Sequence, residues 1–300
     1  MKKNSTLLGY VAAVLIVLYG VSFIPAIRGH NMEKHFQSAL MNKKYENILT
    51  EIEIAGENTS LKLYRRNEND LWKGVSNGSV FPVDNGQIQA FISSFTKVRN
   101  MYKISDSEKK WDFFSLSAQH SVVIVYKLNN DMSTKIYFGG QNFLKNRRYL
   151  RIDNKISSYE IDSDLDVYLT TKESFWYDPY IIPQNVTASS IEDIQSIRIN
   201  GMIYNQKTDD FEEKCTKLLE LRHGEIASIP NDGKKVYLIE VESGDGLYIC
   251  IQVYKTAEGK ILLYTFKNTL DGKKYDYNYA VKISNWTFEK IEKLFPSFKK

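Results

Sequence analysis

An uncharged apolar run from Leu7 to Ile27 constrains this chain more than any other stretch of its sequence. A helix of this length would be roughly 31 Å long, which is close to the thickness of the hydrocarbon core of a bilayer. Lys2 and Lys3 precede the run, and Arg28 follows it. We therefore expect residues 1–28 to form a short cytoplasmic tail and a transmembrane helix, with the lipid bilayer as the partner of residues 7–27.

Two other interpretations of this run fit the sequence less well. A cleaved signal peptide has a shorter apolar core, of about 7–15 residues, and a small-x-small cleavage site. A buried core helix of a globular domain is seldom apolar on every side at the start of a chain. The basic tail favours an N-terminus in the cytoplasm. We expect a single-pass protein of the cell (inner) membrane whose body lies outside the cytoplasm.

The composition of the rest of the chain is that of a globular body. Of the 300 residues, 43% are hydrophobic and 25% are charged, and the net charge is only +4. Positive and negative residues are interspersed, so the sequence lacks the basic surface that nucleic-acid binding requires. The 20 Tyr and 15 Phe residues favour sheets with aromatic cross-strand pairs.

The pattern of the body predicts an α+β fold, in which an N-terminal transmembrane helix precedes two related, mostly antiparallel sheet-plus-helix domains. Residues 29–48 form the expected juxtamembrane segment, where Met32, Phe36 and Leu40 recur at a helical spacing. Residues 49–183 form the first predicted domain and residues 184–300 the second. The order of strand, helix, four strands and helix occurs in both, which indicates an internal repeat.

Two helices stand out within these domains. Residues 85–98 carry apolar side chains at helical spacing after Asp84, a residue type that caps helix N-termini. The final helix is expected to begin at Asn285 as its cap and to run through Leu294. Between the first helix and the next strands, residues 99–110 are basic and polar, and they predict an irregular connection.

The first domain resembles a known bacterial family, domain-of-unknown-function family 4340, over residues 49–183. The matching features are turn and core residues: Trp72, Pro82-Val83-Asp84, Phe138-Gly139, Arg148-Tyr149-Leu150-Arg151 and Ser158-Tyr159-Glu160-Ile161. Phe114-Ser115-Leu116-Ser117 departs from the usual pattern before the central strand. The resemblance implies a membrane-anchored accessory protein, associated with Gld-type ABC-transporter components or a cell-envelope complex. It carries no catalytic residues to transfer.

No pattern in the sequence predicts a catalytic, metal or cofactor site. The four His residues lie far apart and form no zinc-binding motif. Asp162, Asp164 and Asp166 resemble the start of a calcium loop, but Val167 stands where the loop needs Gly. Cys215 and Cys250 are expected to be buried free thiols. A disulfide between them is the alternative if the body lies in an oxidising compartment.

Trp176, Tyr177 and Tyr180 form the most informative aromatic cluster. They suit either a partner surface, because aromatic residues concentrate at interface hot spots, or a plug between the two domains. We expect a non-enzymatic accessory or scaffold protein. The alternative is a module that binds a small envelope ligand, such as a glycan or a lipid headgroup, between the two halves. An envelope hydrolase ranks third, because it would need converging catalytic groups in one cleft.

Overall fold

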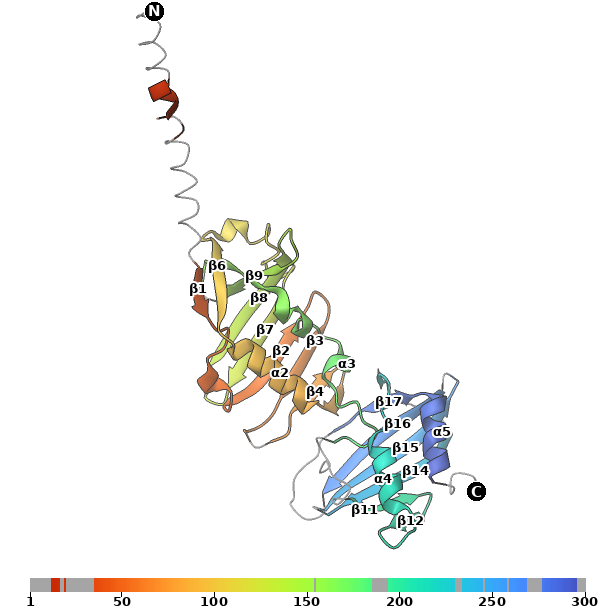
Figure 1. The fold of residues 1–300 in the computed structure, drawn as a ribbon. Helices are drawn as coiled ribbons and strands as arrows, with labels where there is room; N and C mark the ends of the chain where they lie inside the picture. Colours follow the sequence, from red (N-terminus) through yellow and green to blue (C-terminus); the bar gives the residue numbers. More distant parts are fainter. Residues whose placement is uncertain are drawn as a thin grey trace, which may run out of the picture.

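The protein folds into two antiparallel β-sheets that follow one another along the chain (Figure 1). The computed structural model describes residues 12–16, 19, 35–68, 70–153, 155–184, 194–229, 234–244, 246–257, 259–268 and 277–295. Within this part of the chain, ten strands form the first sheet and seven form the second. Buried side chains of both sheets belong to one continuous hydrophobic core.

The first sheet has the strand order β1-β6-β10-β9-β8-β7-β2-β3-β4-β5. Its strands are β1 (His35–Ser38), β2 (Leu49–Ala55), β3 (Ser60–Tyr64), β4 (Lys73–Ser76), β5 (Ser79–Pro82), β6 (Arg99–Ser105), β7 (Val122–Leu128), β8 (Ser133–Gln141), β9 (Arg147–Ile152) and β10 (Ser158–Asp162). The short helices of this half are η1 (Lys43–Tyr45), α2 (Asn85–Thr96), η2 (Glu108–Lys110), η3 (Ser163–Tyr168) and α3 (Glu173–Trp176).

The second sheet has the order β12-β11-β14-β15-β16-β17-β13. Its strands are β11 (Ile194–Ile199), β12 (Met202–Asn205), β13 (Ile226–Ala227), β14 (Lys234–Ser243), β15 (Leu247–Thr256), β16 (Gly259–Asn268) and β17 (Ala280–Ile283). Its helices are α4 (Phe211–Leu219) and α5 (Asn285–Leu294), which lie against one face of this sheet as α2 lies against one face of the first (Figure 1).

The two sheets share one strand order. Read from β6 to β3, the first sheet runs β6-β10-β9-β8-β7-β2-β3, and the second runs β13-β17-β16-β15-β14-β11-β12. Each strand occupies the same place in the chain order of its own half, and α4 holds the place that α2 holds in the first half. The first sheet adds β1 at one edge and the β4–β5 hairpin at the other.

Local sequence patterns explain the main elements. In β2, Leu49, Ile52 and Ile54 are fully buried, and the residues between them are partly exposed, as expected for a strand with one covered face. Helix α2 begins where the carboxylate of Asp84 accepts hydrogen bonds from the first backbone amides, which confirms the predicted cap. The second predicted cap is displaced by one residue, because Ser284 rather than Asn285 caps α5.

The predicted α+β class is wrong, because the protein is mostly β. Among the described residues of the two sheet-bearing halves, the longest helix is α2 with 12 residues. The transmembrane helix that headed the predicted fold is not found either: no helix in the described part of the chain combines the length and the apolarity needed to cross a membrane. Of the run at residues 7–27, only residues 12–16 and 19 are described, and the rest lies outside the described residues.

Two segments that the sequence analysis assigned to other structures are strands. Residues 35–38, expected in a helical juxtamembrane segment, form β1. Residues 99–105, expected in an irregular connection, form β6, with which β1 pairs. Strand β6 is polar, yet Arg99 and Met101 are buried, and Arg99 forms an ion pair with Asp164 at 3.2 Å. Because Arg99 is charged yet buried, the hydropathy of this segment does not show the alternation that indicates a strand.

Candidate functional site at the junction of the two sheets

Trp176 ends α3 and belongs to the core of the first sheet. Its side chain is fully buried and lies against Phe91 and Phe175, with ring centroids 5.9 and 4.9 Å apart. Its indole N–H donates a hydrogen bond to the carbonyl oxygen of Thr170 at 3.0 Å. The polar atom is therefore satisfied, and the whole indole contributes to packing.

Tyr177 connects this core to the second half of the chain. Its hydroxyl donates a hydrogen bond to the carbonyl oxygen of Gly224 at 2.7 Å, and its ring lies 4.8 Å from that of His223. Its backbone forms an isolated antiparallel bridge with Val83. One residue thus contacts the strand edge beside α2 and the segment that follows α4.

Tyr180 makes a second connection. It forms a backbone bridge with Arg222, whose guanidinium lies 5.0 Å from the centre of the tyrosine ring. A guanidinium nitrogen of Arg222 also donates to the Tyr180 hydroxyl at 3.2 Å. The three residues singled out in the sequence therefore lie along one segment, with Trp176 inside the first core and both tyrosines bonded to residues 222–224.

Asp178 and His223 are buried beside these tyrosines. The two ring nitrogens of His223 lie 2.7 Å from the carbonyl oxygen of Gly224 and 2.9 Å from that of Asp178. Burial lowers the pKa of His223, and the two carbonyl contacts, which favour the protonated ring, only partly oppose that effect. The ring is therefore neutral near pH 7, and one of its nitrogens donates a hydrogen bond.

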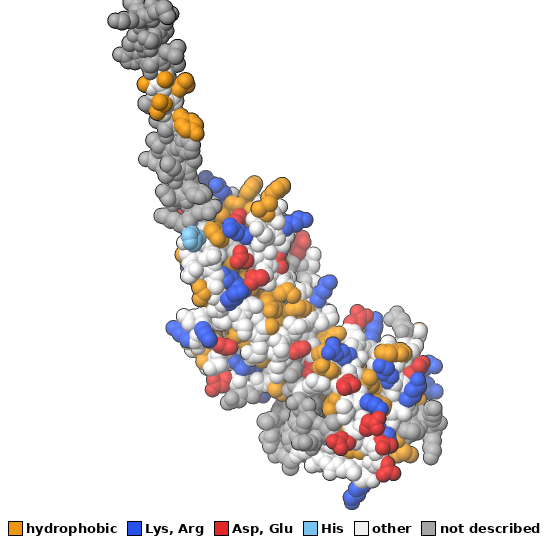
Figure 2. Space-filling view, viewed as in Figure 1, with side chains coloured by type: hydrophobic (Ala, Val, Ile, Leu, Met, Phe, Trp, Pro, Cys, Tyr) orange, Lys and Arg blue, Asp and Glu red, His pale blue; other side chains and the backbone are white. Residues whose placement is uncertain are grey.

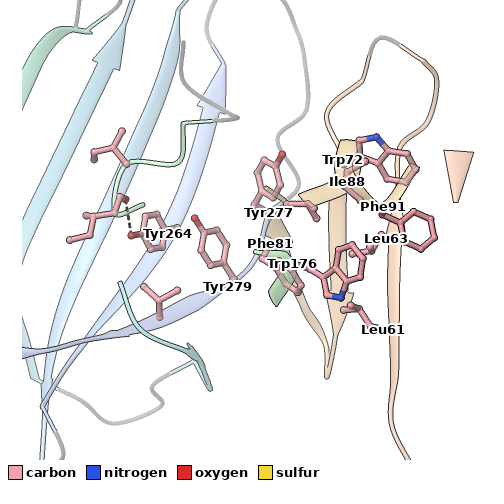
Figure 3. Close-up of a cluster of buried hydrophobic side chains, with 14 of the residues drawn as sticks. Leu61, Leu63, Trp72, Phe81, Ile88, Phe91, Trp176, Tyr264, Tyr277 and Tyr279 are labelled. Atoms are coloured by element: carbon pink, nitrogen blue, oxygen red, sulfur yellow. Dashed lines mark hydrogen bonds between the residues drawn. The ribbon is translucent and has the colours of Figure 1, made fainter. Parts of the chain in front are cut away.

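Aromatic residues of the second sheet complete the junction (Figure 3). The rings of Tyr264 and Tyr279 are stacked at 4.6 Å with an interplanar angle of 6°. The Tyr264 hydroxyl donates to the carbonyl oxygen of Ile181 at 2.8 Å, whereas the buried Tyr279 hydroxyl has no hydrogen-bond partner among the described residues. Burial raises the pKa of both phenols well above the usual value, so both stay neutral.

A direct backbone contact links the two sheets. Val80 in β5 and Asn278 form an antiparallel bridge, in which each backbone amide donates to the carbonyl oxygen of the other at 3.0 and 2.9 Å. The ammonium group of Lys73 lies 5.3 Å from the centre of the Tyr277 ring beside this bridge. Sequence reasoning missed these residues, although Tyr277 and Tyr279 alternate with polar residues as strand residues do.

A separate cavity of about 570 Å³ opens on the first half of the chain. It is lined by polar groups: Glu57, Asp112, Ser115, Gln119, His120 and Ser121, together with Val122. The His120 ring accepts from or donates to the hydroxyl of Ser117 at 3.0 Å. Carboxylate, amide and hydroxyl groups of this kind suit a ligand rich in hydroxyl groups or carrying a positive charge.

Two of the three acidic residues of the calcium-like run have structural partners. Asp164 pairs with Arg99, and Asp166 pairs with Arg148, so both carboxylates hold arginines in place. No cluster of potential metal ligands occurs among the described residues. Cys215 and Cys250 form no disulfide within the described residues. Cys215 is buried as expected, whereas Cys250 is only partly buried. Burial raises the pKa of Cys215 to about 12.

The fold and the junction define a mostly β protein. Its two sheets share an order of seven strands and are joined through an aromatic interface. The chain belongs to the family described as a domain of unknown function, DUF4340, whose model matches residues 72–222. The match begins at Trp72 and ends at Arg222, so it starts later and ends later than the expected range of residues 49–183 and includes α4. No curated protein and no solved structure matches the chain.

Proposed function

We propose that this protein is a non-enzymatic accessory or scaffold component of a cell-envelope or ABC-transporter complex. The observation that carries the proposal is the junction itself. Tyr177 and Tyr180 bond to residues 222–224, the buried Tyr264 bonds to Ile181, and a backbone bridge joins Val80 to Asn278. A body built in this way offers partners two extended surfaces in a constant arrangement.

The location at the cell membrane, with the body outside the cytoplasm, is part of this proposal. Its support is the apolar run at residues 7–27 and the family resemblance, which also suggests the transporter partner. Nucleic acid is not proposed as a partner. On the face drawn in Figure 2, positive and negative side chains are interspersed over both halves of the body, whereas nucleic-acid binding needs a field of one sign.

Co-purification tests the scaffold proposal. The full chain, tagged after Lys300, would be isolated from its own membranes in a mild detergent, and the proteins recovered with it would be identified by mass spectrometry. We expect the same membrane or envelope proteins in repeated preparations. Recovery of the chain alone would contradict the proposal, and a reporter after Lys300 that is active only in the cytoplasm would contradict the location.

The polar cavity favours a second function, the binding of a small envelope ligand such as a glycan or a lipid headgroup. Asp112 and Glu57 would accept hydrogen bonds from ligand hydroxyl groups, and Gln119 can both donate and accept. Calorimetric titration of the full chain with envelope glycan fragments and with glycerophosphoethanolamine, a headgroup that carries an ammonium group, tests this function. Binding should weaken in Asp112→Asn and persist in Asp131→Asn, an exposed turn residue outside the cavity. An absence of binding heat with every probe would exclude it.

A further inference from the structure

The hairpin between β8 and β9 exposes two neighbouring apolar side chains at its tip. Phe143 is 98% exposed and Leu144 is 71% exposed, which makes Phe143 the most exposed large apolar side chain in the described part of the chain. Covering apolar side chains of this size with a partner lowers the free energy, because their surface is removed from water. The exposure of both side chains therefore points to a binding role for the tip.

The tip is a rigid structure, because its backbone is held by a dense set of hydrogen bonds. The side-chain oxygen of Asn142 accepts from the backbone amides of Asn146 and Arg147 at 3.2 and 3.3 Å. The backbone amide of Lys145 donates to the carbonyl oxygen of Asn142 at 3.0 Å, and Lys145 adopts the left-handed conformation that the turn requires. The two apolar residues are thus presented in one defined arrangement.

The base of the hairpin is fixed to η3. Both carboxylate oxygens of Asp166 accept from the guanidinium of Arg148, and one of them also accepts from the side-chain amide of Gln141 at 2.6 Å. The backbone amide of Ser163 donates to the carbonyl oxygen of Asn146 at 3.1 Å. Groups that are ordered before binding lose less conformational entropy when a partner binds.

The second half of the chain shows that this fold does not need an apolar tip. By strand order, the equivalent hairpin joins β15 to β16, and the sequence between those strands is Ala257-Glu258. The hairpin at Phe143 and Leu144 is longer and carries large apolar residues in the corresponding place. Maintaining the sheet is therefore not the reason for these side chains.

We propose that Phe143 and Leu144 insert into an apolar pocket of a partner protein. The charges around the tip favour a protein over a lipid surface. Arg147 and Arg148 beside the tip pair with Glu160 and Asp166, and Asp164 pairs with Arg99. The exposed Lys145 is balanced by the exposed Asp162, so the tip lacks the excess of positive charge that binds anionic headgroups. The proposal deepens the scaffold function and rests on it, because it names the surface through which the accessory protein binds its partner.

In-cell photocrosslinking tests this surface. The full chain would carry p-benzoylphenylalanine in place of Phe143, and a matched chain would carry it in place of Trp286, an exposed aromatic residue on α5. We expect a discrete adduct with one other protein at position 143 and not at position 286. An adduct with twice the mass of the chain, an adduct with lipid, or no adduct would overturn the proposal.

Binding of the identified partner, purified, to the full chain provides the quantitative test. Phe143→Ser should weaken binding at least tenfold, while Trp286→Ser should leave the affinity unchanged. Because Phe143 is exposed, the thermal unfolding of Phe143→Ser should match that of the wild type. If co-purification recovers partners whose affinity Phe143→Ser does not change, this surface is wrong and the scaffold function stands. If co-purification recovers none, the scaffold function fails as well.

Discussion

Trp176 and Trp286 show how differently the same residue type contributes in the two halves of this protein. Trp176 is fully buried among aromatic rings, whereas Trp286 is 67% exposed on α5, where the ammonium group of Lys290 lies 3.5 Å from its ring centre. A buried indole removes a large apolar area from water and fills a volume that no neighbour can occupy. The exposed one does neither.

We expect Trp176→Ala to lower the free energy of unfolding by about 3–5 kcal/mol, because it leaves a cavity between the first core and the junction. Trp286→Ala is the matched control and should cost less than about 1 kcal/mol, since it removes an exposed ring and a cation–π contact. Chemical denaturation of both variants measures the difference. Equal losses would show that Trp176 does not pack as the structure has it.

His223 makes the junction sensitive to acid. Its pKa is lower in the folded protein than the ordinary value of about 6.5, because burial disfavours the charged ring. Below that ordinary value the unfolded chain therefore binds the proton more readily than the folded protein. The contribution of neutral His223 to stability is complete above about pH 6.5 and is lost as the pH falls through the lower pKa of the folded state.

We expect thermal unfolding of the wild type to shift to lower temperature between pH 7.5 and pH 5, and His223→Gln to reduce this shift because Gln cannot be protonated. Gln119→Ala, at an exposed position and without loss of a titratable group, should keep the pH dependence of the wild type. Melting curves at several pH values for the three proteins provide the measurement. A His223→Gln variant that follows the wild type at every pH would refute the assignment.

At the scale of elements, the segment between η2 and β7 is held against the sheet by close contacts that hydropathy cannot reveal. The guanidinium of Arg151 lies between the rings of Trp111 and Tyr137, and it donates a hydrogen bond to the carbonyl oxygen of Leu116 at 2.9 Å. The backbone amide of Gly140 donates to the carbonyl oxygen of Phe114 at 3.0 Å. The segment therefore lies directly on β8.

Gly139 and Gly140 differ sharply in how they tolerate a side chain. A methyl group on Gly139 would lie 2.2 Å from the carbonyl oxygen of Phe114, whereas one on Gly140 would have no atom nearer than 3.8 Å. We expect Gly139→Ala to destabilise the protein by about 1–3 kcal/mol and Gly140→Ala by less than about 0.5 kcal/mol. Urea denaturation measures both. Similar values for the two variants would contradict the close contact.

At the scale of the whole molecule, the β4–β5 addition to the first sheet makes a direct backbone contact with the second half of the chain. Strands β4 and β5 have no counterpart in the second sheet, and β5 carries Val80, whose backbone pairs with Asn278. The backbone amide of Val80 points away from β4, because it donates to the carbonyl oxygen of Asn278. The hairpin thus covers one sheet edge and connects the two halves.

We expect Val80→Pro to weaken the coupling of the two halves, because proline lacks the amide that donates to Asn278. Calorimetry should then resolve two unfolding transitions, while Val80→Ala, which keeps the amide, should retain a single transition. Hydrogen exchange at Asn278 should also become faster in Val80→Pro. A single unchanged transition in Val80→Pro would show that the bridge does not couple the sheets.

Family membership and several local elements could be predicted from the sequence alone, because they depend on short-range physics. The cap at Asp84 and the apolar stripe of α2 are set by residues within one or two helical turns. The turn and core residues from Trp72 to Ile161 suffice for the family resemblance. Trp176, Tyr177 and Tyr180 can also be recognised in the sequence as an aromatic cluster, although the residues that they contact cannot.

Only the tertiary structure decided the class of the fold and the chemistry of the junction. Strand β6 is polar, and its partners β1 and β10 lie far from it in the sequence, so no local pattern predicts it. His223 and Asp178 are 45 residues apart, and their burial depends on both sheets together. Hydrogen bonds between distant strands and burial between separate sheets are properties of the folded chain, because each needs groups that the sequence keeps apart.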